Sequence, residues 1–127
     1  MKELEIGEVA KLIKLKPHTL RYYENIGLIK DVKRNDSGNR IYSEKDLRWI
    51  EFLKRLKATG MKISKMKEYA ELKNLGDTTI SQRRTILKEH LNLIEDEIKV
   101  LLETQEYVKD KIEIYKEMEE DFNDRRE

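Results

Sequence analysis

Residues 17–42 read PHTLRYYENIGLIKDVKRNDSGNRIY, and this segment carries the strongest local signals in the chain. Pro17 suits the first turn of a helix, where its missing N–H would have no partner. Gly27 is the residue type that most often follows a helix end. The sequence therefore predicts a short helix over 17–26, followed by a basic hairpin that turns at Asp36–Asn39.

A second short helix is predicted just upstream, because apolar residues recur at positions 6, 9, 10 and 13. Two short helices joined by about three residues have the spacing of a helix-turn-helix. On the helix that starts at Pro17, Leu20 and Tyr23 fall on one side and are expected to pack against Val9 and Leu12. The opposite side is rich in hydrogen-bond donors, since it presents His18, Arg21 and Tyr22. Such a face is suited to guanine edges and phosphates, although it also fits an ordinary solvated surface.

Beyond the hairpin, Ser43 and Asp46 have capping-box spacing and open a third helix. Leu47, Ile50, Leu53 and Leu56 recur on one face of it, and Trp49 and Phe52 are expected to pack in the same core. A fourth helix follows over residues 62–72, and its methionines are expected to fill the core. The basic connection at 54–62 is a candidate for a second wing.

Charge divides the chain into two halves of opposite sign. Residues 1–76 hold 18 Lys and Arg against 11 Asp and Glu, a net of +7, whereas residues 77–127 hold 9 against 15, a net of −6. This imbalance favours a polyanion as partner of the first half, although chance produces such imbalances too. The absence of cysteine excludes disulfides and thiolate metal sites. No signal peptide or membrane-spanning run is present, so a cytoplasmic protein without a membrane partner is expected.

The C-terminal half is predicted to form one long helix with an apolar seam. Its residues alternate at spacings of four and three, which is the heptad pattern of a coiled coil. Such a seam requires a partner in water, and the simplest partner is a second copy of the chain. Gln105 is interpreted as a polar residue that sets the register, and His90 as a flank residue. The predicted dimerisation residues are Leu87, Leu91, Ile94, Ile98, Leu101, Gln105, Val108, Ile112 and Tyr115.

These segments together resemble the MerR family of bacterial transcription regulators. The matching residues are IGEVAKL at 6–12, PHTLRYYENIGLI at 17–29, RIY at 40–42, DLRWIEFL at 46–53 and GMKI at 60–63. The resemblance implies a mainly α fold, in which a winged helix-turn-helix precedes a long dimerising coiled-coil helix. It also implies DNA contacts. We combine the positions that the resemblance implies with the basic residues found from the sequence pattern. The predicted DNA-binding residues are then Lys16, His18, Thr19, Arg21, Tyr22, Arg34, Arg40, Tyr42, Arg55 and Lys57.

The predicted domains are a DNA-binding domain over 1–74, a linker over 75–80, a coiled coil over 81–122 and an acidic tail over 123–127. The chain departs from the family pattern at Glu5, Lys14 and Lys16, where a cap, a turn glycine and a second cap are usual. Each departure is expected to lose about 1 kcal/mol of capping, and the two lysines are expected to gain phosphate contacts instead.

The resemblance further implies an antiparallel homodimer on a palindromic promoter, which it bends and untwists so that RNA polymerase engages. No catalytic constellation is evident, so the chain is not expected to be an enzyme or to carry a cofactor or metal. An architectural DNA protein and a coiled-coil scaffold are the alternatives; the long coil argues against the first and the basic half against the second. Two alternatives remain for the control of this protein. It responds to a small molecule or stress signal, with a ligand site near Tyr69, Tyr107 or Tyr115, or it acts constitutively.

Overall fold

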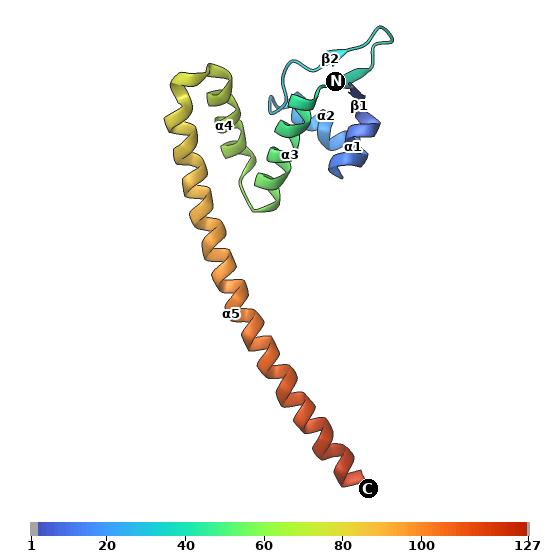
Figure 1. Cartoon of the computed structure of the whole chain (residues 1–127), viewed down its shortest axis with the longest axis vertical. Coiled ribbons are helices and arrows are strands. Elements are labelled where there is room, and N and C mark those ends of the chain that lie inside the picture. Colours follow the sequence, from blue (N-terminus) through green and yellow to red (C-terminus); the bar gives the residue numbers. More distant parts are fainter. Residues whose placement is uncertain (1–2, 127) are drawn as a thin grey trace. The chain divides into compact units, whose positions relative to one another are not determined.

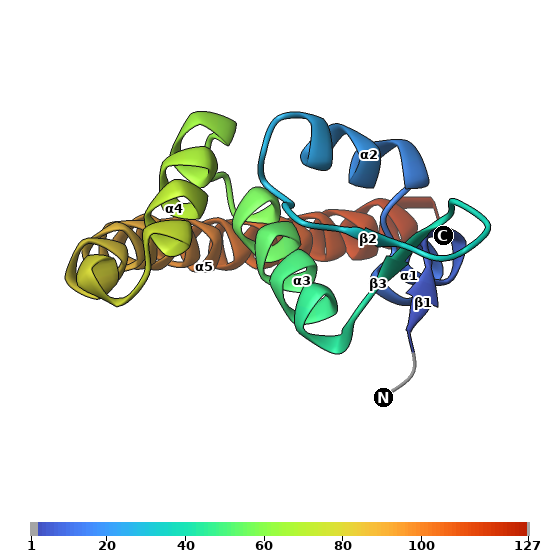
Figure 2. The ribbon, with the colours of Figure 1, turned by 90° about the horizontal axis from the view of Figure 1, so that it is seen from above.

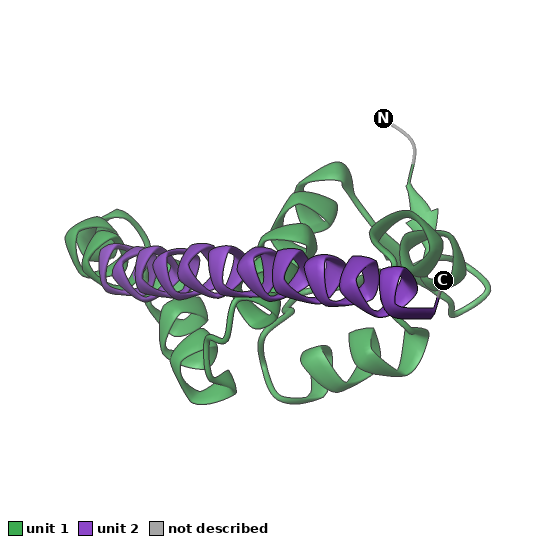
Figure 3. Ribbon diagram, turned by 90° about the horizontal axis from the view of Figure 1, so that it is seen from below, with its two compact units in different colours: residues 1–86 green, residues 87–127 purple. Residues whose placement is uncertain are grey.

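The computed structural model describes residues 3–126 and divides the chain into two compact units, residues 1–86 and 87–127 (Figure 3). The helical first unit carries a small sheet, and the second is formed by most of one long helix (Figure 1). The elements in chain order are β1 (Leu4–Glu5), α1 (Ile6–Ile13), α2 (Pro17–Asn25), β2 (Lys33–Arg34), β3 (Arg40–Tyr42), α3 (Glu44–Ala58), α4 (Ile63–Leu75), the 3₁₀ helix η1 (Asp77–Thr79) and α5 (Ile80–Arg126).

The helix ends follow the local sequence signals. α2 begins at Pro17 and ends before Gly27, whose φ of 85° is the left-handed conformation that glycine adopts without strain. At the start of α3 the Ser43 hydroxyl accepts the Asp46 N–H, and Asp46 accepts the Ser43 N–H in return, so the predicted capping box is confirmed. The first helix is not left uncapped at Glu5, because the Glu8 carboxylate accepts the Glu5 N–H at 3.2 Å.

The sheet has three strands, whereas the sequence predicted only a two-stranded wing. β3 lies between β1 and β2, and both pairings are antiparallel (Figure 2). Leu4 pairs with Tyr42 and Glu5 with Ile41, so the residues just before α1 join the base of the wing. A two-residue strand carries no period-2 pattern, which is why its sequence gave no signal.

The core of the first unit lies where α1, α2, α3 and the sheet meet. Val9 and Leu20 are completely buried, as predicted, but Leu12 is 65% exposed and does not join them. The prediction for Leu12 is wrong because the buried face of α1 is centred on Val9, Ala10 and Ile13, about 100° around the helix from it. The α3 side of the core consists of Ile50, Leu53 and Leu56. Met61, from the connection before α4, and Met66, from α4, fill it as predicted.

The predicted linker at 75–80 is an ordered turn. Gly76 has a φ of 95°, and η1 follows it directly. The Thr79 side chain is buried, and its hydroxyl donates to the carbonyls of Leu72 and Gly76. These hydrogen bonds therefore tie the end of α4 to η1, which leads directly into α5.

α5 continues without a break from Ile80 to Arg126, which includes residues 123–126 of the predicted tail. The apolar seam residues from Leu91 to Phe122 are mostly exposed, with values between 48% for Val108 and 68% for Leu101. His90 differs from its prediction as a flank residue, because it is only 6% exposed. It lies one helical turn after the buried Ile86, so the buried face of α5 continues to this residue. No helix within residues 3–126 is both long and apolar enough to span a bilayer.

Candidate nucleic-acid interface

α2 presents one buried and one open face. Leu20 and Tyr23 anchor it to the core, with exposed fractions of 0% and 4%. His18, Arg21 and Tyr22 point outward, and Tyr22 is 50% exposed. No side-chain hydrogen bond or ion pair involves these three residues in the part of the chain that the structure describes. Their donors are therefore available to a ligand.

The turn before α2 is basic and departs from the usual capping chemistry. Lys14 has a φ of 62°, a left-handed conformation that costs a non-glycine residue about 1 kcal/mol or more. Lys16 stands at the N-cap, where its side chain makes no capping hydrogen bond, but its carbonyl accepts the N–H groups of Thr19 and Leu20. Both lysines are exposed, whereas Thr19 is half-buried. The missing cap predicted at Lys16 is confirmed.

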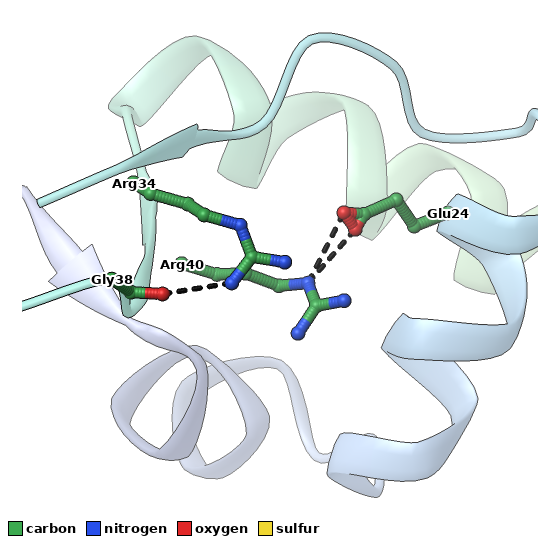
Figure 4. Close-up of polar contacts among 4 residues, drawn as sticks. All are labelled: Glu24, Arg34, Gly38 and Arg40. Atoms are coloured by element: carbon green, nitrogen blue, oxygen red, sulfur yellow. Dashed lines mark hydrogen bonds and ion pairs between the residues drawn. The ribbon is translucent and has the colours of Figure 1, made fainter.

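The wing turn is organised by Asn35, a residue that the sequence analysis did not single out. Its side-chain amide oxygen Oδ1 accepts the backbone N–H groups of Ser37 and Asn39, at 3.1 and 3.0 Å. Arg34 closes the same turn, because its guanidinium donates to the Gly38 carbonyl at 2.7 Å (Figure 4). Arg34 remains exposed at the wing.

A half-buried ion pair joins α2 to the wing. The Arg40 Nε donates to both carboxylate oxygens of Glu24, at 2.8 and 3.1 Å, and each side chain is 23% exposed (Figure 4). This hydrogen bond raises the pKa of the Arg40 guanidinium, although partial burial opposes the rise. The pairing orients Arg40 and fixes the wing against α2. Sequence reasoning missed Glu24, because its partner is 16 residues away.

Tyr42 is placed differently from its prediction as a DNA contact. Its side chain is completely buried, and its hydroxyl has no hydrogen-bond partner among the described residues. Burial raises the pKa of Tyr42, and the nearby Glu24 carboxylate adds to the rise. In this structure Tyr42 is thus a core residue of β3, because alternation along the strand turns it inward.

The end of α3 supplies the second basic segment. Arg55 is exposed and donates to Glu51 at 3.1 Å, and Lys57 is exposed in the last turn of the helix. Lys54 is used structurally, since its ammonium donates to the Ile13 carbonyl at the end of α1, at 2.7 Å. Lys54 therefore anchors α3 to the helix-turn-helix rather than extending the basic connection.

This arrangement, with an open donor face on the second helix and a basic wing fixed beside it, defines a winged helix-turn-helix protein. Residues 4–73 match the MerR helix-turn-helix family of regulatory proteins, and residues 47–110 match the MerR DNA-binding family. The first match covers more than half of the chain. The chain therefore belongs to the MerR family of transcriptional regulators.

Two curated relatives agree with this assignment. The transcriptional regulator AdhR of Bacillus subtilis is 47% identical over 93 residues, which are 72% of this chain and 66% of AdhR. A helix-turn-helix regulator of Haemophilus influenzae is 35% identical over 104 residues, covering 80% of this chain and 77% of the relative. The chain thus spans just under two thirds of the length of AdhR.

Two solved structures have the same fold over nearly the whole chain. The first is HiNmlR, a MerR family regulator lacking the sensor domain, bound to promoter DNA; it has a TM-score of 0.85 and 30% identity and covers 91% of this chain and 92% of its own. A MerR family regulator from Listeria monocytogenes has a TM-score of 0.82 and 33% identity, with coverage of 98% and 99%.

Proposed function

We propose that this chain is a homodimeric regulator that binds a palindromic promoter site in the cytoplasm and distorts it to control transcription. The observation that carries the proposal is the open face of α2. There His18, Arg21 and Tyr22 have no side-chain hydrogen bond within residues 3–126 and stand beside an ordered basic wing. The likeness to HiNmlR, whose structure contains promoter DNA, supports it.

The residues proposed to meet DNA fall into two roles. Arg21 is the proposed base reader, because a free guanidinium on a recognition helix pairs with a guanine edge through two parallel hydrogen bonds. The others are proposed to hold phosphates or support the fit: Lys16, His18, Thr19, Tyr22, Arg34, Arg40, Arg55 and Lys57. Tyr42 is left out of this set because its hydroxyl is inaccessible.

The seam on α5 supports the homodimer. Seven of its apolar side chains are exposed by about half or more: Leu91, Ile98, Leu101, Val108, Ile112, Tyr115 and Phe122. Burying a large aliphatic side chain from full exposure contributes about 1.5–3 kcal/mol, so a partner helix gains roughly half of that at each position. An antiparallel second copy is the proposed partner, by resemblance to the family.

A second apolar line runs along α5 and was missed by the sequence analysis. Leu93, Val100, Tyr107 and Ile114 repeat at intervals of seven and are 48–74% exposed. They stand about 100° around the helix from the nearer edge of the seam. Since a two-stranded coiled coil buries only the seam, a partner that covers no more than the seam leaves this line exposed.

The proposed mechanism follows from a two-fold dimer on DNA. Two copies of α2 read two half-sites, and the α5 pair sets the distance between them. Bending and untwisting of the intervening promoter then aligns its elements for RNA polymerase. The deformation is repaid by the extra phosphate contacts of the two wings.

The test is a footprint of the full chain on the DNA upstream of its own coding region, with its mass in solution measured by light scattering. A protected palindrome and twice the mass of the chain are the expected results. Uniform protection of any DNA would favour an architectural protein, and a monomer that binds with full affinity would contradict the dimer.

Arg21→Ala tests base reading within the same assay. Loss of a bidentate base contact is expected to weaken binding to the protected site by about 1–3 kcal/mol and to change binding to random DNA far less. Arg48→Ala is the control, because Arg48 is also an exposed arginine and lies outside the proposed site. Equal losses on specific and random DNA would show that Arg21 contacts only phosphate.

A further inference from the structure

The first unit contains a cavity of about 200 Å³ away from the open face of α2. It lies between the connection that follows α2, the first turns of α3 and the last turns of α4. Its lining combines an indole and short apolar groups with three lysines and two aspartates. These residues are Leu28, Lys30, Asp31, Lys45, Asp46, Trp49, Ala70, Lys73 and Asn74.

Trp49 forms a fixed wall of this cavity, although the sequence predicted a simple packing role for it. Its side chain is only half-buried, and the indole N–H donates to the Leu28 carbonyl at 2.7 Å. Tyr69 stacks on the indole, with ring centroids 6.0 Å apart. The Lys73 ammonium lies 3.8 Å from the centroid of the Trp49 ring. An aromatic surface and a cation are thus held next to each other.

The lysines of the cavity lack internal counterions. Among residues 3–126, none of Lys30, Lys45 and Lys73 forms an ion pair. Of the two lining carboxylates, Asp46 accepts the Ser43 N–H but keeps its negative charge, which acts on Lys73. Asp31 is exposed, so solvent screens it. Three lysines against two aspartates leave the lining with a net charge of +1.

The surroundings of Lys73 make an anion favourable there. Burial lowers the pKa of Lys73, the positive charges of Lys45 and Arg83 lower it further, and the negative charge of Asp46 offsets only part of the fall. A bound anion would offset both effects, because it supplies the opposite charge that stabilises the protonated amine. The π-face of Trp49 offsets only part of this cost.

We propose that this cavity binds a small organic carboxylate, whose apolar body lies against Trp49, Leu28 and Ala70 and whose carboxylate is held by Lys73 and Lys45. The volume is below the 300–1,000 Å³ typical of drug-sized ligands, which restricts the ligand to about the size of a single ring. The cavity reaches the segment Leu28–Asp31, which connects α2 to the wing. The idea that such a ligand controls DNA binding depends on the proposed function. The idea that the cavity binds a carboxylate does not depend on it.

The experiment measures binding of benzoate to the full chain by calorimetry, without DNA. Trp49 is the only tryptophan in the chain, so its fluorescence reports directly on this cavity. Saturable binding of one benzoate per chain is expected, with a matching fluorescence change. Benzamide has the same shape without the charge and is expected to bind at least about tenfold more weakly.

Two lysine variants locate the site. Lys73→Gln is expected to weaken benzoate binding about 10- to 100-fold, the usual effect of losing a charge-assisted hydrogen bond. Lys45→Gln is expected to weaken it in the same direction. Lys67→Gln is the matched control, because Lys67 is an exposed lysine on α4 outside the cavity. Circular dichroism of each variant confirms that it is folded.

Several outcomes would overturn the proposal. These are the absence of saturable benzoate binding, equal affinity for benzamide, and equal behaviour of the Lys73 and Lys67 variants. Equal affinity for inorganic phosphate would show a plain anion site with no organic specificity and would also reject it. Because no DNA is present, the result is independent of the footprint that tests the proposed function.

Discussion

The ion pair between Glu24 and Arg40 predicts a measurable coupling between α2 and the wing. The perturbation is a double-mutant cycle with Glu24→Gln and Arg40→Gln. A charge-assisted hydrogen bond contributes about 1.5–3 kcal/mol, and an exposed surface pair only about 0.2–1 kcal/mol. The pair has a 2.8 Å contact and 23% exposure on both sides. We therefore expect a coupling free energy of about 1–2 kcal/mol.

The assay is urea unfolding of the four proteins at low and at high salt. Glu44 and Arg48 on α3 provide the control pair, because their contact is 3.5 Å long and their side chains are 56% and 68% exposed. The control cycle is expected to give about 0.3–0.5 kcal/mol and to lose it in high salt. Most of the Glu24–Arg40 coupling should persist there, since solvent screens it less.

One result would refute this reasoning: a Glu24–Arg40 coupling no larger than that of the control pair. It would mean that partial burial adds nothing to the contact and that the wing is not held by it. DNA binding gives a second readout. If Arg40 also contacts a phosphate in the complex, Arg40→Gln should reduce the salt dependence by about one unit of slope, while Glu24→Gln should not.

Two further predictions concern Tyr42 and Lys14. Tyr42→Phe should leave stability unchanged or raise it by up to about 1 kcal/mol, because the hydroxyl is buried and has no partner among residues 3–126. Because the pKa of Tyr42 is raised in the folded protein, the unfolded chain releases this proton first above pH 10, and the stability of the wild-type protein falls as the pH rises. The stability of Tyr42→Phe, measured by urea unfolding, should fall less steeply over this range. A clear loss of stability or of DNA affinity in Tyr42→Phe would show that the hydroxyl has a partner. Lys14→Gly should stabilise the fold by about 1 kcal/mol, because glycine adopts the left-handed conformation without strain, and destabilisation in urea unfolding would contradict the assigned strain. If Lys14 contacts a phosphate, the same variant should also lower the salt dependence of DNA binding.

The elements of this protein were predictable from sequence because each is announced by residues close to one another. Pro17 and Gly27 delimit α2, Ser43 and Asp46 cap α3, and the four-three spacing from Leu87 marks the seam of α5. Helix periodicity also placed Arg21 and Tyr22 on the open face. These signals act within about one or two helical turns, which is the range over which a sequence pattern specifies structure.

Contacts between distant residues were decided only by the tertiary structure. Arg40 meets Glu24 from 16 residues away, and the Trp49 indole reaches the Leu28 carbonyl from 21 residues away. Tyr42 pairs with Leu4 of β1, a strand of two residues with no pattern of its own. The sequence by itself thus determined which face of α2 stays open and which face of α5 carries the apolar seam. Packing determined how the wing is fixed and where a cation and an indole share a cavity, because such distances depend on how several elements meet in space.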